Sequence, residues 1–476
     1  MRESLMPPGP ADLCLTPAQM RDLGYRVIDA IVEHFEKLPE KCPSRRRTRD
    51  ELEALLREPP PERGQDPQAV LEQALSAVFA NMMHVDHPRF FAFVPGPSNF
   101  VGAMADALAA GFNPFAGSWF SGSGPAELEL VVVDWLRELL GFPESAGGLF
   151  VSGGSVANLT GLAAARHALR RDGAPDGVVY FSDQTHSAVV RALRILGFAD
   201  DRMRRLPSDE NFRLPVAELR AAIAEDRAVG RRPLLIVANA GTTNTGAVDP
   251  LPELASLARR HGLWLHVDGA YGAAAALIPE GKAMLSGLEE ADSLALDPHK
   301  WLFQPFEIGC TLVREAEVLK DAFRILPEYL QDVHRLRDAV NFCDYGIQLT
   351  RGCRALKLWM SLKVFGLHAF RQAIARGFRL AEAAERRLQA GGCWEIVSPA
   401  QMAVVCFRYR DPARTPEAVD RLHPELVERM IADGYAVLTS TVLRGRTVLR
   451  LCTINPRTQE DEVEQTIARL ERLACG

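Results

Sequence analysis

The sequence predicts an α/β protein with a mainly parallel central sheet, preceded by an N-terminal helical segment and followed by a small α+β domain. Two observations support this prediction. Between about residues 100 and 320, short β-branched runs alternate with helical segments, which is typical of parallel strands joined by covering helices. Near residue 365 the composition changes to strands that alternate with two helical stretches. We therefore predict three regions, 1–99, 100–364 and 365–476.

The first region is expected to contain helices separated by an exposed crossing. Residues 16–38 carry apolar side chains at helical spacing, with Thr16 as the N-cap. The charged, proline-containing stretch 39–67 predicts one short helix, and its basic SRRRTR run is typical of a solvated face. A further helix is expected over 67–83, ahead of the segment HPRFFAFVPGPSNF.

The second and third regions are expected to alternate strands and helices. Strands of the second region are predicted at 148–154, 177–183, 233–241 and 263–270, with helices at 155–169, 187–197 and 250–262. Strands of the third region are predicted at 394–399, 402–410, 435–442 and 447–455, with helices around 415–433 and 458–474. In parallel sheets ligands bind at the carboxyl ends of strands, which is where the polar motifs of this chain occur.

Composition excludes several classes of protein. Of 476 residues, 47% are hydrophobic and 24% are charged, as in ordinary globular proteins. The net charge of −6 gives no indication of a basic surface that would bind nucleic acid, although it is compatible with the binding of small anionic ligands. No apolar stretch is long enough to span a bilayer, and the N-terminus lacks the apolar core of a signal peptide. Nine cysteines without a CxxC pair indicate neither a disulfide framework nor a metal site, so we expect a cytosolic protein.

Lys300 occupies an unusual position in the stretch DSLALDPHKW, where the neighbouring residues are suited to burial. A buried ammonium is costly and tends to lose its proton, and the resulting amine is a good nucleophile toward an aldehyde. The alternative is a surface lysine after a turn, which is the commoner situation. The polar residues that follow other predicted strands help to decide between these two interpretations of Lys300.

These strand ends offer groups that suit one ligand. LFVSGGSVANLTG leads through glycines into a helix whose free N–H groups can hold a phosphate, although simple Gly-Ser caps are common. Asp268 in HVDGAYG needs a cationic partner, either a structural ion pair or a protonated ring nitrogen. His186 in DQTHSAVVRAL is either a core histidine or a flat group that stacks on a ring. Thr242 and Thr243 follow another strand.

Together, a phosphate cradle, a flat stacking group, a carboxylate and a lysine amine match the needs of pyridoxal phosphate. They occur in the order expected if successive strands of one sheet each supply one group. The sequence therefore predicts that Lys300 is the amine that binds the aldehyde of this cofactor.

At the level of the whole chain, the sequence resembles the group II pyridoxal-phosphate-dependent amino acid decarboxylases, most closely the aromatic-L-amino-acid decarboxylase branch. The resemblance extends from LTPAQMRDLGYRVIDAI through HPRFFAFVP, GSWFSGSGPAELELVVVDWL, FSDQTHSAVVRAL, HVDGAYG and DPHKWL to RALKLW and LRLCTINPRT. It implies decarboxylation of an aromatic L-amino acid, such as tyrosine, DOPA, phenylalanine or tryptophan, to the amine. It also implies an aspartate-aminotransferase-like fold and an obligate homodimer, with the active site at the interface and N-terminal helices around the partner.

The resemblance further implies roles for individual residues. Lys300 would bind the cofactor, Asp268 would pair with the pyridine nitrogen, and His186 would stack on the ring. The residues expected to hold the phosphate or line the site are Gly154, Ser155, Thr243 and His299. Tyr329, within FRILPEYLQDVHRLRD, would protonate the carbon that has lost carbon dioxide. Relatives that form aldehydes with oxygen often have phenylalanine there, so the tyrosine favours simple decarboxylation.

Two departures from the family pattern concern Asp297 and the substrate pocket. Animal aromatic decarboxylases have asparagine where this chain has Asp297. Since a carboxylate would repel the phosphate, we expect Asp297 to point at another donor. The residues implied to bind the substrate are Phe93, Gly96, Phe115 and Thr350. Gly96 replaces a threonine of the animal enzymes, Thr350 replaces a glycine that helps admit indoles, and Phe115, larger than its usual counterpart, is expected to reach across the dimer.

Other functions are compatible with parts of this pattern. An aldehyde synthase on the same scaffold is the nearest alternative, followed by a decarboxylase of acidic or diamino acids. An aminotransferase is disfavoured because the wider motif set belongs to decarboxylases. A cofactor-free scaffold protein is also an alternative, but the presence of Lys300, Asp268, His186 and Tyr329 argues against it.

Overall fold

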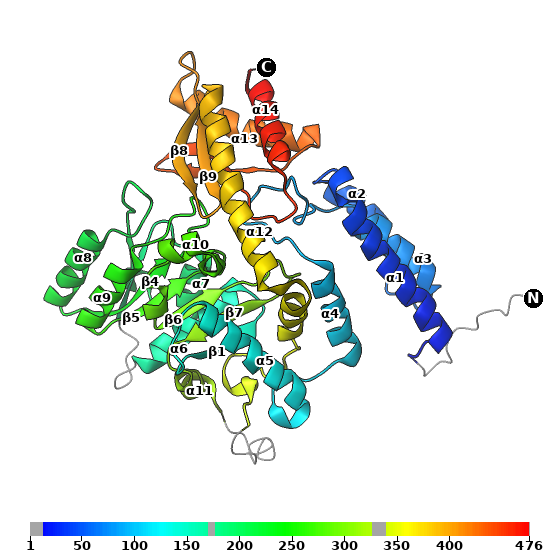
Figure 1. Ribbon diagram of the computed structural model, residues 1–476, viewed down its shortest axis with the longest axis horizontal. Coiled ribbons are helices and arrows are strands. Elements are labelled where there is room, and N and C mark those ends of the chain that lie inside the picture. Colours follow the sequence, from blue (N-terminus) through cyan, green and yellow to red (C-terminus); the bar gives the residue numbers. More distant parts are fainter. Residues whose placement is uncertain (1–12, 170–176, 326–338, 476) are drawn as a thin grey trace, which may run out of the picture.

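The computed structural model describes residues 13–169, 177–325 and 339–475. Figure 1 shows an N-terminal group of helices at one side, a central sheet with helices, and a smaller C-terminal unit, linked by the long helix α12. The N-terminal helices are α1 (Pro17–Lys37), α2 (Arg49–Leu56) and α3 (Pro67–Gln73), and α3 continues into a π-helical turn, η2 (Ala74–Phe79).

The N-terminal helices begin where their capping residues predict. The Thr16 side chain accepts a hydrogen bond from the backbone N–H of Gln19, while the Gln19 side chain accepts one from the N–H of Thr16. Thr48 and Glu51 form the same reciprocal cap on α2. The helix predicted over 67–83 is shorter, because its regular part passes into the π-helical turn and ends at Phe79.

The central unit contains a seven-stranded sheet within the described residues. Its strands are β1 (Gly147–Val151), β2 (Gly177–Ser182), β3 (Met203–Leu206), β4 (Arg232–Asn239), β5 (Trp264–Asp268), β6 (Ser293–Leu296) and β7 (Gly309–Val313). Its helices are α4 (Phe100–Phe112), α5 (Trp119–Leu139), α6 (Gly154–Ala168), α7 (Ser187–Ile195), α8 (Val216–Ala228), α9 (Leu251–His261), α10 (Pro279–Met284) and α11 (Glu317–Phe323).

The strand order is β1-β7-β6-β5-β4-β2-β3. Strand β7 is antiparallel to both of its neighbours, and the remaining pairs are parallel. The predicted mainly parallel sheet is thus confirmed, and β3, β6 and β7 are strands that the sequence pattern did not indicate. Because β2, β4, β5 and β6 run in the same direction, their carboxyl ends share one edge of the sheet.

Two apolar layers sandwich this sheet. Alternate residues of β2 point to opposite faces, so that Val178 and Tyr180 join one cluster while Val179 and Phe181 join the other. The first cluster includes side chains of α5, α8, α9 and α12, and the second includes those of α6, α7 and α11. Helix coverage of both faces is the arrangement that a parallel sheet requires.

The C-terminal unit is built on a four-stranded antiparallel sheet with the order β10-β11-β9-β8. Its elements are α12 (Ala355–Gly391), β8 (Trp394–Gln401), β9 (Val404–Tyr409), α13 (Pro416–Asp433), β10 (Thr439–Leu443), β11 (Arg446–Cys452) and α14 (Glu460–Cys475). Helix α12 runs through the domain boundary expected at 364/365 and is kinked nearby at Gly366, where φ is 73°.

Strand β10 begins later than predicted, because the residues before it pair with the N-terminal region. The N–H of Phe91 donates to the carbonyl of Val437 at 2.7 Å, and the N–H of Val437 donates to the carbonyl of Arg89 at 3.0 Å. This pairing attaches the segment before Phe93 to the C-terminal unit.

Within the described ranges, every helix is too short or too polar to span a bilayer.

Candidate active site

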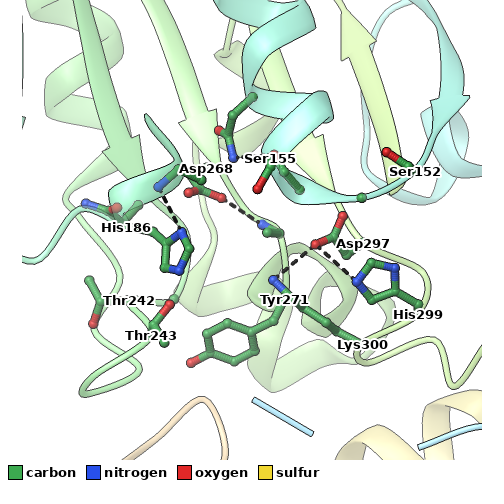
Figure 2. A pocket seen from close by; sticks show the side chains of 17 residues that line it. Ser152, Ser155, His186, Thr242, Thr243, Asp268, Tyr271, Asp297, His299 and Lys300 are labelled. Atoms are coloured by element: carbon green, nitrogen blue, oxygen red, sulfur yellow. Dashed lines mark hydrogen bonds and ion pairs between the residues drawn. The ribbon is translucent and has the colours of Figure 1, made fainter. Parts of the chain in front are cut away.

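A cavity of about 340 Å³ lies at the carboxyl edge of the parallel strands (Figure 2). The sequence places a loop or helix start at each strand end, and these segments form the walls of the cavity. The lining residues are Ser152, Gly153, Gly154, Ser155, Asn158, His186, Ala188, Asn239, Gly241, Thr242, Thr243, Asp268, Ala270, Tyr271, Asp297, His299 and Lys300. All the residues predicted from the sequence to contact the cofactor are in this set.

Lys300 follows β6 and projects into the cavity, where its Nζ lies 3.0 Å from Oδ2 of Asp297 (Figure 2). The Lys300 side chain is 26% exposed and that of Asp297 is 1% exposed. Oδ2 of Asp297 also lies 3.6 Å from Nε2 of His299. Among the described residues, Oδ1 of Asp297 has no hydrogen-bond partner. The carboxylate therefore points at two basic side chains of its own turn.

His299 is held in place by the chain that follows it. Its Nδ1 accepts a hydrogen bond from the N–H of Ile308 at 3.2 Å, and its ring contacts the edge of the Phe306 ring, with the ring centres 5.0 Å apart. Burial lowers the pKa of His299, the neighbouring charge of Lys300 lowers it further, and the Asp297 carboxylate acts in the opposite direction. The lowered pKa favours the neutral imidazole at neutral pH.

The first turn of α6, which the sequence predicted to hold a phosphate, lines one end of the cavity. A side chain at Gly153 would lie 3.0 Å from Cε1 of His299, and one at Gly154 would lie 2.6 Å from Oδ2 of Asp297. Only glycine therefore leaves the backbone N–H groups accessible beside these side chains. The first N–H groups of a helix have no partner within the helix, so they can bind an anion at this end of the cavity.

Asp268 ends β5 and is 7% exposed. Its Oδ1 accepts a hydrogen bond from the N–H of Ala270 at 3.1 Å, which holds the carboxylate at the wall of the cavity. An anionic group fixed in this way suits a protonated ring nitrogen.

His186 is the N-cap of α7, and its Nδ1 accepts a hydrogen bond from the N–H of Ala188 at 3.2 Å. This bond fixes the imidazole ring at the cavity wall opposite the turn that carries Lys300 (Figure 2).

Asn239 is a site residue that the sequence reasoning missed. Its side chain donates to Oγ1 of Thr185 at 3.1 Å and to Oδ2 of Asp249 at 2.9 Å. Burial raises the pKa of Asp249 to about 6. Three hydrogen bonds to its carboxylate act in the opposite direction, from the backbone N–H of Leu214 and from the backbone and side chain of Asn239. This network connects the ends of β2 and β4 just before His186. The only signal in the sequence was an aspartate ten residues after an asparagine, which is too common to be informative.

The predicted substrate residues lie outside this cavity. Among the described residues, Phe93, Gly96, Phe115 and Thr350 are all absent from its lining. Gly96 packs so closely on the Phe306 ring that a side chain at this position would collide with it. Phe306, which also contacts His299, is a second residue near the site that the sequence reasoning missed.

Phe115 and Thr350 belong to a separate surface. A side chain at Gly117 would lie 2.7 Å from Cε1 of Phe115 and 2.5 Å from the carbonyl oxygen of Leu349, so these two segments meet there. Thr350 and Phe115 are both exposed in the single chain. Phe93 is also exposed and has a positive φ of 51°. Tyr329, the predicted proton donor, lies outside the described residues.

The cavity fits pyridoxal phosphate. An anion cradle, a carboxylate and a lysine amine line one cavity of suitable shape, and its lysine is paired with a carboxylate that would otherwise lack a cation. The fold and this donor set define a pyridoxal-phosphate enzyme of the aspartate-aminotransferase-like fold type.

Comparison with known proteins narrows this class. Residues 50–410 match the pyridoxal-dependent decarboxylase conserved domain. The chain is 47% identical to the aromatic-L-amino-acid decarboxylase of Bacillus atrophaeus over 97% of both chains, and 32% identical to the phenylacetaldehyde synthase of Petunia hybrida over 94% of this chain and 93% of the synthase. A crystal structure of Oryza sativa TDC with PLP and tryptamine superposes with a TM-score of 0.92 at 30% identity, over 97% of this chain and 98% of that chain.

The chain belongs to the pyridoxal-dependent decarboxylase family. It is an enzyme whose cofactor is pyridoxal 5'-phosphate, as the sequence motifs predicted. The expected family, fold class and type of reaction are thereby confirmed.

Proposed function

We propose that this enzyme decarboxylates an aromatic L-amino acid to the corresponding amine and carbon dioxide. The observation that carries the proposal is the 47% identity to an aromatic-L-amino-acid decarboxylase over 97% of both chains, together with the complete set of cofactor groups around Lys300. Phenylalanine, tyrosine and DOPA are the expected substrates, and tryptophan is a weaker one because Thr350, which we expect to enter the pocket from the partner chain, would narrow it.

The side chains of the cavity have distinct proposed roles. Lys300 would hold the cofactor until the substrate amine replaces it. Asp268 would bind the ring nitrogen and keep it protonated, because its carboxylate is held at the strand end by Ala270. His186 would lie against the ring face, oriented by its bond from Ala188. The phosphate would bind at the start of α6, where the proposed contacts are Gly154, Ser155, Thr243 and His299.

When bound, pyridoxal phosphate supplies an aldehyde for the substrate amine and a ring that withdraws the electron pair left by the departing carbon dioxide. The protein must then deliver a proton to the same carbon. We assign this proton to the hydroxyl of Tyr329, which follows from the resemblance to decarboxylases. The cost of losing such a general acid is typically about 100- to 10,000-fold in rate.

We infer a homodimer in which each active site is completed by the partner chain. Helix α1 has no residue that is buried by the described part of the chain, and it extends away from the central unit (Figure 1). Its exposed apolar side chains are Met20, Tyr25, Ile28 and Val32. A helix with an uncovered apolar stripe is stabilised by burial against another surface. Phe115 and Thr350 would reach the partner's cavity from their separate surface.

We also assign the enzyme to the cytosol. All nine cysteines are free in the described ranges, and several of them are buried beside apolar residues. Free thiols in this number are typical of a reducing compartment.

The test is a substrate panel with two products measured for each substrate. Purified holoenzyme is incubated with the twenty common amino acids, DOPA and 5-hydroxytryptophan, and amine and carbon dioxide are quantified together. We expect equal amounts of both from aromatic substrates. A preference for glutamate, aspartate or diaminobutyrate would overturn the aromatic assignment while leaving the decarboxylase class intact.

One alternative has a specific observation in its favour. The similarity to a phenylacetaldehyde synthase covers most of the chain. In an enzyme of that kind, carbon dioxide would form together with aldehyde, ammonia and hydrogen peroxide, and oxygen would be consumed. Measuring oxygen uptake in the same panel separates this alternative from amine formation.

A further inference from the structure

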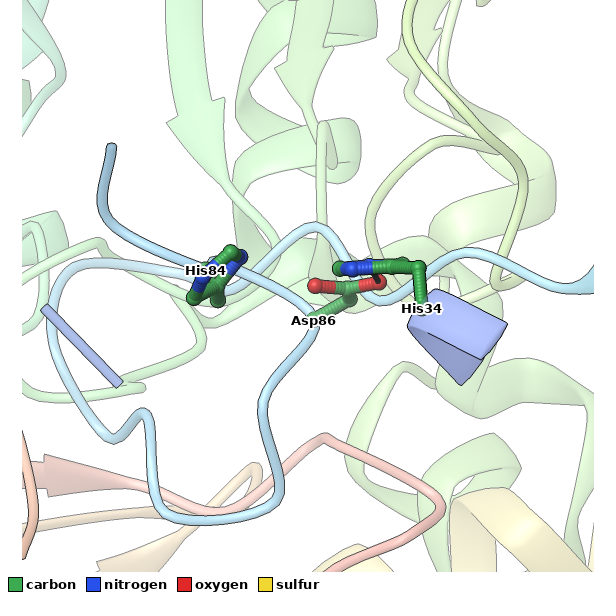
Figure 3. Close-up of side chains that lie close together, drawn as sticks. All are labelled: His34, His84 and Asp86. Atoms are coloured by element: carbon green, nitrogen blue, oxygen red, sulfur yellow. Dashed lines mark hydrogen bonds and ion pairs between the residues drawn. The ribbon is translucent and has the colours of Figure 1, made fainter. Parts of the chain in front are cut away.

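A group of two histidines and one aspartate lies outside the active site, where helix α1 meets the loop that precedes Phe90 (Figure 3). The side chains of His34, His84 and Asp86 each present one potential ligand atom, and these atoms lie within 4.8 Å of one another. In the view of Figure 3 the His34 ring is seen edge-on against the Asp86 carboxylate, and the His84 ring lies to one side of both. In the part of the chain that the structure describes, no other group of three such residues is this compact.

His84 is the unusual member of this group. It is 7% exposed, and within the described residues its Nδ1 has no hydrogen-bond partner. The nearby His87 shows the ordinary arrangement, since its Nδ1 accepts from the N–H of Arg89 at 3.0 Å and its Nε2 contacts the carbonyl of Lys41 at 3.0 Å. A buried polar atom without a partner is costly, and native structures rarely retain one without a function for it.

His34 and Asp86 complete the set from two different elements. Nε2 of His34 lies 3.4 Å from Oδ2 of Asp86, and their side chains are 29% and 10% exposed. The rings of His34 and His84 have centres 5.4 Å apart. The His34 side chain is thus partly accessible and can rotate, whereas His84 and Asp86 are fixed in the loop.

We propose that His34, His84 and Asp86 bind a divalent transition metal of the zinc type, with water as a fourth ligand. Zinc binds imidazole nitrogen and carboxylate oxygen at about 2.0–2.2 Å, and three protein ligands with one water is a common coordination set. Two ligand atoms on one tetrahedral zinc are about 3.4 Å apart. The His34–Asp86 pair is already at this separation, and the widest pair, at up to 4.8 Å, would close by about 1.4 Å to form the site.

The ligand set, two imidazoles and one carboxylate, favours a transition metal over calcium or magnesium. Arg457 donates to the carbonyl of Asp86 at 3.4 Å and to the carbonyl of Ser98 at 2.7 Å, and its guanidinium lies 5.0 Å from the centre of the Phe35 ring. This positive charge opposes any cation at the site, so metal binding depends on the two imidazole ligands. Imidazole-rich sites suit zinc, copper, nickel and iron, whereas calcium and magnesium need more oxygen ligands.

Such a site would attach α1 to the loop that leads to Phe93 and Gly96. His34 is in the last turn of α1, and Asp86 is joined to the C-terminal unit because Asn455 donates to its carbonyl at 2.9 Å. The metal would connect the N-terminal helix, which we assign to the dimer interface, with the segment that approaches the active site. The metal-site proposal does not depend on the proposed substrate.

The test is zinc binding by the full-length holoenzyme after removal of metals with a chelator. The variants are His34→Ala, which removes a partly exposed ligand, and Asp86→Asn, which keeps the size and a hydrogen-bond acceptor but removes the charge. His368→Ala is the matched control, because His368 is an exposed histidine of α12 outside the group. Zinc content is measured after gel filtration, and the thermal midpoint is measured with and without zinc chloride.

We expect one more zinc per chain in wild type and His368→Ala than in either ligand variant. Zinc should raise the thermal midpoint of wild type and control only. Loss of a residue that only hydrogen-bonds to a metal ligand typically lowers metal affinity by about 10- to 100-fold. Loss of a ligand itself should lower the affinity at least as much. Cobalt added to wild type should show visible bands of nitrogen and oxygen ligation without thiolate features, which distinguishes this site from binding at cysteines.

Equal zinc content and equal zinc-induced shifts in wild type, His34→Ala and Asp86→Asn would overturn the proposal. Cobalt spectra with thiolate features that persist in both variants would do so as well. Both results are independent of decarboxylase activity, so a failure here leaves the proposed function untouched.

Discussion

Lys300 and Asp297 form an ion pair within one turn, with Nζ of the lysine 3.0 Å from Oδ2 of the aspartate. The carboxylate is nearly fully buried, whereas about a quarter of the lysine side chain is exposed. A buried carboxylate requires a cation, and Lys300 compensates the charge of Asp297.

The first prediction concerns Lys300→Ala. Turnover should fall by several orders of magnitude, because no amine remains to hold the cofactor. The apoprotein should also lose roughly 1–3 kcal/mol of unfolding free energy, since Asp297 is left buried without its cation and partial exposure of the lysine moderates the loss. Borohydride reduction of wild type followed by peptide mapping should label Lys300, and a label on any other lysine would contradict the assignment.

The matched control for stability is the double variant Lys300→Ala/Asp297→Asn. Removing the unpaired charge should restore part of the lost unfolding free energy without restoring turnover. Urea unfolding is measured for the apoproteins of wild type, Lys300→Ala, Asp297→Asn and the double variant. The four unfolding free energies give the coupling free energy between the two side chains. Additive losses would show that the ion pair makes no contribution to stability.

The second prediction concerns Asp268. Asp268→Asn should reduce turnover by about 100- to 1,000-fold, the range for loss of one fixed electrostatic partner, and should weaken cofactor binding. The reason is that a neutral amide does not favour the protonated ring nitrogen. Asp268→Glu should retain more activity because it keeps the charge. Steady-state kinetics at saturating cofactor provide the test, and unchanged turnover in Asp268→Asn would show that another group binds the ring nitrogen.

The third prediction concerns substrate size. Thr350→Gly should raise the ratio of tryptophan to tyrosine turnover, because a tight pocket rejects added volume by about 10- to 200-fold. The Phe306 ring lies directly against Gly96, so the space beside this glycine depends on the position of that ring. The kcat/KM of both substrates is measured in wild type and variant. A wild-type preference for tryptophan would contradict this account of the pocket.

The fourth prediction separates amine from aldehyde formation. Tyr329→Phe removes one hydroxyl, so substrate binding should change little while proton delivery to the substrate carbon is lost. Without that proton, reaction with oxygen should dominate, giving aldehyde, ammonia and peroxide. Oxygen uptake and amine yield are measured together in both proteins. We expect amine with almost no peroxide from wild type, and oxygen consumption in step with substrate in wild type would identify an aldehyde synthase.

The fifth prediction is loss of stability in acid. Burial lowers the pKa of His266 from 6.5 to about 4, although the charge of Asp268 acts in the opposite direction. Between these two values the unfolded chain binds a proton that the folded chain excludes, so the free energy of unfolding falls as pH falls below 6.5. One such histidine contributes up to about 1.4 kcal/mol per pH unit, and on the order of 3 kcal/mol in all.

His266→Gln tests this linkage. The variant should be less stable at pH 7, because two buried bonds to Ser293 and Asn158 are disturbed, but its stability should depend less on pH. His167→Gln is the control, since His167 is exposed. Urea unfolding is followed from pH 7 to pH 5 at fixed protein and cofactor concentrations. An unchanged acid slope in His266→Gln would show that His266 does not exclude the proton.

The sequence by itself determined the class of the enzyme, and the residues that it singled out for the cofactor line one cavity in the structure. Strand, glycine turn and helix start are encoded within a few residues, as at 148–155, because backbone preference and capping act locally. Asp268 was placed at a strand end by the sequence pattern, whereas Lys300 was singled out by the motif DPHKW, because β6 was not indicated by that pattern. In the structure Asp268 ends β5 and Lys300 follows β6, and the topology brings the carboxyl ends of these strands to one edge.

Only the tertiary structure decided which side chains face one another across distant segments. His34 and Asp86 are 52 positions apart, and no local pattern indicates that their side chains meet. The close contact of Gly96 with the Phe306 ring likewise joins two segments that lie far apart in the sequence. Side-chain packing and buried polar pairing are set by the whole fold, which local sequence preference does not encode.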